Sequence, residues 1–130
     1  MIEEVHHGAK MLASFTEPGI HFCNENDASQ TIAFMRHPKG KEIVPHVGNP
    51  VERTVTDTQE TFFIRKGSLR VDFYTQEKEY LESGTLTAGD AILLIAGGHG
   101  FEAMDDLEMI EVKQGPGVGD ADKVRFERPA

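Results

Sequence analysis

The stretch ETFFIRKGSLRVDFY, residues 60–74, decides the fold. It contains two runs rich in Phe, Ile, Leu, Val and Tyr, Glu60 to Arg65 and Leu69 to Tyr74, on either side of the turn dipeptide Lys66-Gly67. Short runs of this composition, separated by turn residues, are typical of β-strands. The stretch therefore predicts two consecutive strands joined by a tight turn.

The same spacing continues on both sides of this stretch. Turn residues such as Pro38-Lys39-Gly40 and Ala88-Gly89-Asp90 separate further short runs. No run shows a helical stripe, and none is followed by the helix that a parallel sheet would require. We therefore expect an all-β protein with an antiparallel sheet, closed or sandwiched. The further expected strands are Thr31 to His37, Glu42 to His46, Glu79 to Thr87, Ala91 to Ile95, His99 to Met104 and Leu107 to Lys113.

The length of 130 residues and the mass of 14.4 kDa fit a single domain, because a chain of this size offers little material for two independent cores. We expect residues 1–18 to form an N-terminal arm, residues 19–113 a barrel and residues 114–130 a C-terminal tail. Within the arm, Val5 to Phe15 fits either a short helix or an extended segment.

The net charge of −9 and the sequence pI near 5.0 argue against nucleic acid or an anionic membrane as a partner, because phosphate binding needs clustered Lys and Arg. No apolar run approaches the roughly 20 residues that span a bilayer, and the acidic N-terminus differs from a secretory signal. We therefore expect a cytoplasmic protein. Cys23 is the single cysteine, and its apolar neighbours predict a reduced thiol in the core.

The alternation of side chains along the run Glu60 to Arg65 places a carboxylate on an otherwise apolar face of the strand. Side chains two residues apart share a face of a strand, so Glu60 shares one with Phe62 and Ile64. Glu60 is then either solvated at the end of the strand or directed inward. An inward carboxylate must be paired or bound to a metal, because burying it alone costs several kcal/mol.

Two motifs surround this carboxylate. The segment GKEIVPH, Gly40 to His46, is followed by Glu60 and then by six residues and Gly67; a second segment, GDAILLIAGGH, runs from Gly89 to His99. In this order the two segments resemble the two signatures of the cupin family. The resemblance covers roughly residues 32 to 113. It implies a double-stranded β-helix, the antiparallel jelly-roll barrel of that family.

The resemblance also implies metal ligands at His46, Glu60 and His99. Gly48 stands where the family has a second histidine, and Ile95 replaces the proline of the second signature. Two imidazoles and one carboxylate still form a facial triad of the kind that holds one divalent ion such as Fe, Mn, Ni or Zn. The three remaining ligands therefore predict a site for one divalent metal ion, or a metal site that has decayed.

The resemblance further implies an enzyme acting on a small polar metabolite, either a metal-dependent dioxygenase or a sugar isomerase or epimerase. His46 and His99 are then the catalytic histidines. Two other classes stay open: a non-catalytic domain that binds a small ligand or sugar, and a metal-independent isomerase that uses His46 or His99 as a general acid and base.

Two further residues are candidate substrate contacts. Arg53 lies in the insertion of residues 49–59, which we expect to cover the barrel mouth as a loop, and it is the plausible contact for an anion. His37 is either a spare acid–base group in the barrel or a solvated residue at a strand end. Exposed strand edges and outward apolar residues such as Phe63 predict a homodimer.

Overall fold

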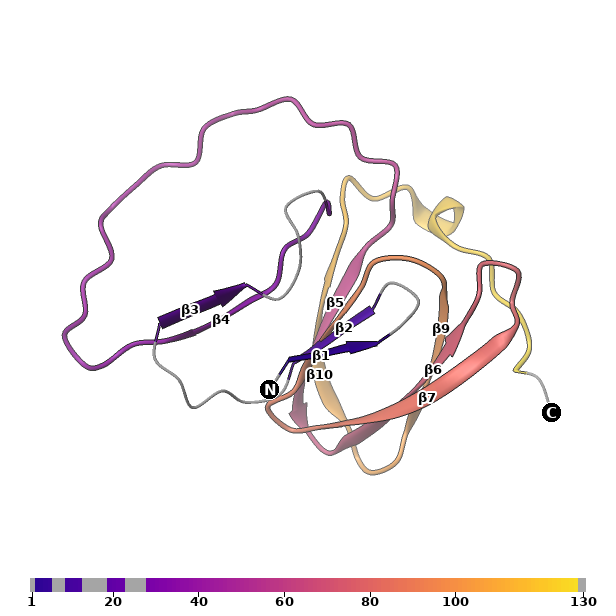
Figure 1. Ribbon diagram of the computed structural model, residues 1–130. Helices are drawn as coiled ribbons and strands as arrows, with labels where there is room; N and C mark the ends of the chain where they lie inside the picture. Colours follow the sequence, from indigo (N-terminus) through magenta and orange to yellow (C-terminus); the bar gives the residue numbers. More distant parts are fainter. Residues whose placement is uncertain (1, 6–8, 13–18, 23–27, 129–130) are drawn as a thin grey trace.

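The computed structural model describes residues 2–5, 9–12, 19–22 and 28–128, and the fold is all-β with antiparallel sheets (Figure 1). No helix in these ranges is long and apolar enough to cross a bilayer. The strands are β1 Ile2–Val5, β2 Ala9–Leu12, β3 Gly19–Phe22, β4 Ala33–Arg36, β5 Glu60–Lys66, β6 Ser68–Tyr74, β7 Tyr80–Thr87, β8 Ala91–Leu94, β9 Gly98–Ala103 and β10 Glu108–Lys113, and a 3-10 turn, η1, covers Gly119–Asp122.

The strands form two main sheets and a separate ribbon. The first sheet has the order β1-β2-β8-β5-β10, the second has the order β7-β6-β9, and β3 pairs only with β4. Every pairing is antiparallel, which confirms the predicted fold class. Among the described residues no strand pairing joins one main sheet to the other, so the sheets face each other without closing into a barrel.

The main core lies between the two sheets. Leu69 and Val71 of β6 are fully buried, and they pack with Phe62 and Ile64 of β5. The alternation predicted for β5 is therefore confirmed, because its even-numbered apolar residues face the core. A smaller cluster on the other side of β8 is built from Ile32, Ala91 and Leu93, with Phe34 and Ile95 packed against it.

A single residue, Gly67, connects the two sheets between β5 and β6. Its backbone has a φ of +86°, a conformation that favours glycine, and a Cβ there would collide with the carbonyl oxygen of Asp106. The amide of Met104 donates to the carbonyl of Ser68 at 3.0 Å beside it. The predicted turn at Lys66-Gly67 is confirmed, and it is a corner between sheets.

The C-terminal tail covers the outer face of β6. The ring of Phe126 lies 5.0 Å from that of Tyr74 at 90°. Tyr74 is only 3% exposed, and Gly98 on β9 leaves room for it, since a Cβ at this glycine would lie 3.2 Å from the Cβ of Tyr74. The tail is therefore packed at Phe126.

The expected strand Glu42 to His46 is wrong. The structure has no regular secondary structure between residues 41 and 59, and this part of the chain is exposed throughout residues 41–58. Within the described ranges no strand lies beside it to accept its hydrogen bonds, and Pro45 has no amide hydrogen to donate. Of the segment Val5 to Phe15, the described residues belong to strands β1 and β2, and the remainder lies outside the described residues.

Gly67→Ala should destabilise the fold more than Gly40→Ala. Both glycines have nearly the same φ, +86° and +87°, but only Gly67 has backbone within reach of a new Cβ. The Gly40 variant should cost about 1 kcal/mol for the left-handed conformation. The Gly67 variant should cost about 2 kcal/mol more because the corner must open. Urea denaturation of both variants measures the difference, and equal losses would contradict the account of the corner.

Asp72 joins the tail to β6. It is 2% exposed, it accepts hydrogen bonds from Ser83 and Arg70, and Arg128 lies 3.5 Å away. Burial opposes its ionisation, but these hydrogen bonds and the two arginine charges outweigh burial and lower the pKa of Asp72 below 3.8. The carboxylate therefore stabilises the fold at pH values above 3.8, and the stabilisation is lost as the pH falls through the lowered pKa.

Asp72→Asn should lower the free energy of unfolding by about 1 kcal/mol near neutral pH, because the two arginines lose their charged partner. The difference from wild type should shrink as the pH falls below 3.8. Chemical denaturation between pH 7 and pH 3 tests this, with Asp57→Asn on an exposed segment as the control. A loss that is independent of pH would exclude a role for the ionised carboxylate.

Candidate functional site

Glu60 is the first residue of β5 and lies on its inner face. It is 7% exposed and precedes the core residues Phe62 and Ile64 on the same face. Its neighbours in register are Leu94 of β8 and Lys113 of β10. The carboxylate therefore lies at the open end of the space between the sheets. Of the two positions that the sequence left open for Glu60, the structure has the inward one.

His99 meets Glu60 from the opposite sheet. It lies on β9 next to Phe73 of β6, and its Nε2 is 3.2 Å from Oε2 of Glu60. The imidazole packs against Phe101, with ring centroids 5.2 Å apart, and more distantly against Phe62, at 6.5 Å. Its side chain is 28% exposed, so the ring combines an apolar floor with access to solvent.

The surroundings keep Glu60 ionised. The hydrogen bond from His99 is the main cause that lowers the pKa of Glu60, and it outweighs the burial that raises it. The charges of Lys123 and Lys113 lower the pKa further. Lys113 is itself held by Asp122 of η1, with Nζ 2.8 Å from the carboxylate oxygen. The site is therefore a buried carboxylate with an imidazole partner and two nearby cations.

The structure does not bring His46 to this pair. His46 lies on the exposed segment that follows β4, where its Nδ1 is 2.9 Å from the carbonyl oxygen of Val44. Gly48 is exposed on the same segment. Within the described ranges no three His, Cys, Asp or Glu side chains are placed to hold one metal ion. The residues as arranged do not fit a three-ligand metal centre, and the metal triad stays a prediction.

The two candidate substrate contacts also lie elsewhere. Arg53 is exposed on the same segment as His46. His37 follows β4, is half-buried, and its Nε2 is buried without a hydrogen-bond partner among the described residues. The polar contacts of Glu60 and His99 in the described chain involve neither residue. Cys23 lies outside the described residues.

Sequence reasoning missed the two lysines. Lys113 is visible as the last residue of an expected strand, but its place beside Glu60 depends on the register between β10 and β5. Lys123 lies in a tail whose path is set by the contact of Phe126 with Tyr74. Neither pairing has a local sequence signal, because both join segments far apart in the chain.

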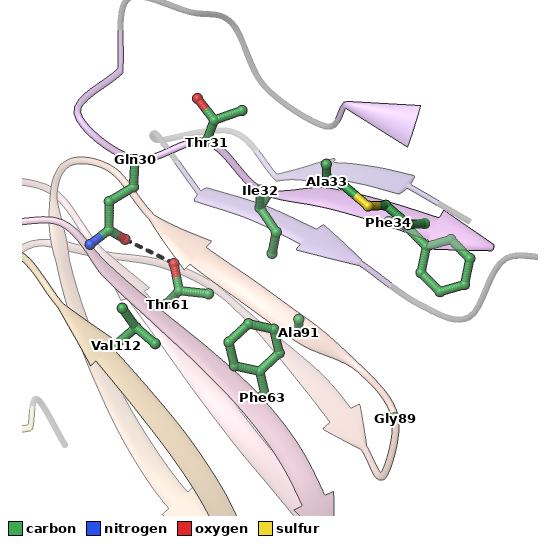
Figure 2. A pocket seen from close by; sticks show the side chains of 11 residues that line it. Gln30, Thr31, Ile32, Ala33, Phe34, Thr61, Phe63, Gly89, Ala91 and Val112 are labelled. Carbon is green, nitrogen blue, oxygen red and sulfur yellow. Dashed lines mark hydrogen bonds between the residues drawn. The ribbon is translucent and has the colours of Figure 1, made fainter. Parts of the chain in front are cut away.

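A cavity lies on the other face of β5. This apolar groove has a volume of about 560 Å³ and runs between the segment of residues 30–35 and the outer face of the five-stranded sheet (Figure 2). At one end, the hydroxyl of Thr61 donates to the amide oxygen of Gln30 at 2.9 Å. The groove is lined by Gln30, Thr31, Ile32, Ala33, Phe34, Met35, Thr61, Phe63, Gly89, Ala91 and Val112.

Comparisons with known proteins find no relative of this chain. No family model matches the chain, and neither a curated protein nor a solved structure matches it.

A double-mutant cycle measures the contact between the sheets. Glu60→Gln and His99→Gln should each destabilise the fold, and their effects should be non-additive by about 1 kcal/mol, because each substitution alone already breaks the same contact. Glu108→Gln with His99→Gln is the control, since Glu108 is exposed at the far end of β10 opposite Lys66. Additive effects in the first cycle would mean that the observed pair contributes no stability.

Proposed function

We propose that this chain is a small cupin-type enzyme in which Glu60 and His99 move a proton on a small polar metabolite, as in isomerases and epimerases. The single observation that carries the proposal is the distance of 3.2 Å between Nε2 of His99 and the buried carboxylate of Glu60. A carboxylate that accepts a hydrogen bond from one ring nitrogen of a histidine orients the ring and leaves the other nitrogen as the proton acceptor.

The chemistry follows from the two ring nitrogens. With Nε2 donating to Glu60, Nδ1 is the nitrogen that accepts a proton from a carbon next to a carbonyl group and returns it on the product side. Glu60 stabilises the imidazolium that forms in between. The exposure of His99 admits a substrate, and the rings of Phe62 and Phe101 exclude water from one side of the imidazole.

Charge near the pair favours an anionic or hydroxy-keto substrate. Lys123 acts on Glu60 electrostatically, whereas Lys113 is already paired with Asp122. Lys123 therefore supplies positive charge next to the reacting groups, where an enolate or a carboxylate of the substrate would gain from it.

The exchange of a substrate hydrogen for deuterium tests the proposal and requires no knowledge of the product. Small hydroxy-keto compounds are incubated with the protein in D₂O and chelator, and loss of the proton next to the carbonyl is followed by NMR. Wild type should catalyse the exchange, and His99→Gln should lower the rate about 100-fold or more. His46→Ala, which alters the exposed segment, should leave the rate unchanged.

A metal-dependent enzyme, dioxygenase or isomerase, is the second candidate, because two of the three predicted ligands, Glu60 and His99, are in contact. It requires His46 to reach them. In that case chelator abolishes the exchange, and Fe(II), Mn(II), Ni(II) or Zn(II), loaded anaerobically, binds wild type but neither His46→Ala nor His99→Ala. Ligand binding without exchange, unaffected by Glu60→Gln, would instead indicate a non-catalytic binding domain.

A further inference from the structure

Residues 38–58 form an extended segment whose apolar side chains are exposed. This segment is called the arm from here on and is distinct from the N-terminal residues 1–18. The arm follows β4, bows away from the sheets and returns to β5 (Figure 1). At its start, the Lys41 amide donates a hydrogen bond to the Pro38 carbonyl at 3.2 Å. Its exposed aliphatic residues are Ile43 at 60%, Val44 at 80%, Val47 at 84%, Val51 at 58% and Val55 at 40%. Five exposed aliphatic side chains on one segment are typical of a surface that another surface covers.

The groove on the outer face of β5 is the matching apolar surface. Phe63, Val112 and Met35 line it, and these side chains are 40%, 49% and 54% exposed. Ile110, opposite Phe63 on the neighbouring strand, extends the same face and is 51% exposed. Such cross-strand neighbours form one continuous surface. Strand β10 is also the edge of its sheet, so its outer backbone groups are open to a further extended segment.

We infer that the arm of one copy packs into the groove of a second copy, and that the second arm returns the contact, so that two chains form a dimer with exchanged arms. In a two-fold dimer each chain contributes its arm once and its groove once, so the exposed apolar surfaces of the arm and the groove are covered in both chains. The arm bows outward from its own body, which presents it to a neighbour (Figure 1).

The charges of the arm and of the rest of the chain are compatible with this contact. The arm carries three basic residues, Lys39, Lys41 and Arg53, and three acidic residues, Glu42, Glu52 and Asp57, and is therefore neutral. The net charge of −9 lies wholly on the rest of the chain. A neutral arm adds no repulsion between like charges when it packs against the acidic remainder of a second copy.

Crosslinking of mixed variants distinguishes a second copy from the same copy. In a Cys23→Ser background, one preparation carries Val44→Cys on the arm and another carries Val112→Cys in the groove. A thiol-specific crosslinker should join chains in the mixture of the two preparations and leave each preparation alone largely uncrosslinked at this pair. Crosslinks that form only inside single chains carrying both cysteines would place the arm in its own groove and overturn the inference.

Light scattering gives the second test. Wild type should have twice the 14.4 kDa mass of one chain. Val44→Asp with Val47→Asp on the arm, or Val112→Asp in the groove, should raise the dimer dissociation constant about 100-fold or more, because a charge enters an apolar contact. Val124→Asp is the matched control, since Val124 is 74% exposed on the tail.

Three further outcomes would overturn the inference: a monomer at all concentrations, a dimer that neither the arm nor the groove variants weaken, or a dimer that still binds an apolar dye in the groove, with binding lost in Val112→Asp. The dye result would indicate a site for a small apolar ligand instead. None of these outcomes depends on the activity of the Glu60–His99 pair.

Discussion

The corner at Gly67 determines where the functional groups lie. The chain leaves the five-stranded sheet at Lys66 and enters the three-stranded sheet at Ser68, so β5 and β6 face each other across the core. Sheets packed in this way lie about 10 Å apart, a distance that two facing side chains bridge. Glu60 begins β5 and is far from the corner; His99 is equally far because β9 pairs antiparallel with β6 and sets it beside Phe73. The pair forms at the open end of the core as a consequence of these registers.

Much of this arrangement is readable from local sequence. The turn at Gly67 and the strands on either side of it follow from composition and alternation. Alternation also places Glu60 on the face of Phe62 and Ile64, but it leaves open whether the carboxylate is solvated or directed inward. These features depend on neighbours a few residues apart, for which sequence patterns are informative.

The features that sequence reasoning missed depend on distant partners. The segment Glu42 to His46 has strand composition, but a strand also needs a neighbour, and no described strand lies beside it. Lys123 reaches the site because Phe126 packs on Tyr74 and Asp122 on Lys113. The groove exists because the segment before β4 lies over β8 through Ile32. None of these contacts has a periodic signal in the chain.

The two faces of β5 separate two kinds of surface. Glu60 and Phe62 face the core and the polar pair, whereas Thr61 and Phe63 face the groove. Because the alternation of a strand keeps the two sets apart, a substitution on the outer face changes the apolar surface without touching the carboxylate. Substitutions in β5 can therefore alter the Glu60–His99 pair and the groove separately.

The path of the arm also makes the molecule divisible. In a single copy of the chain, Lys39, Lys41 and Arg53 offer sites for trypsin on the connection between β4 and β5, and cleavage there breaks none of the described strands and removes nothing from the core. The N-terminal piece stays attached because β2 pairs with β8 through four residues and Ile32 packs on Ala91 and Leu93. The chain can accordingly be treated as two complementing fragments, which gives a way to label the polar pair and the N-terminal strands separately for spectroscopy.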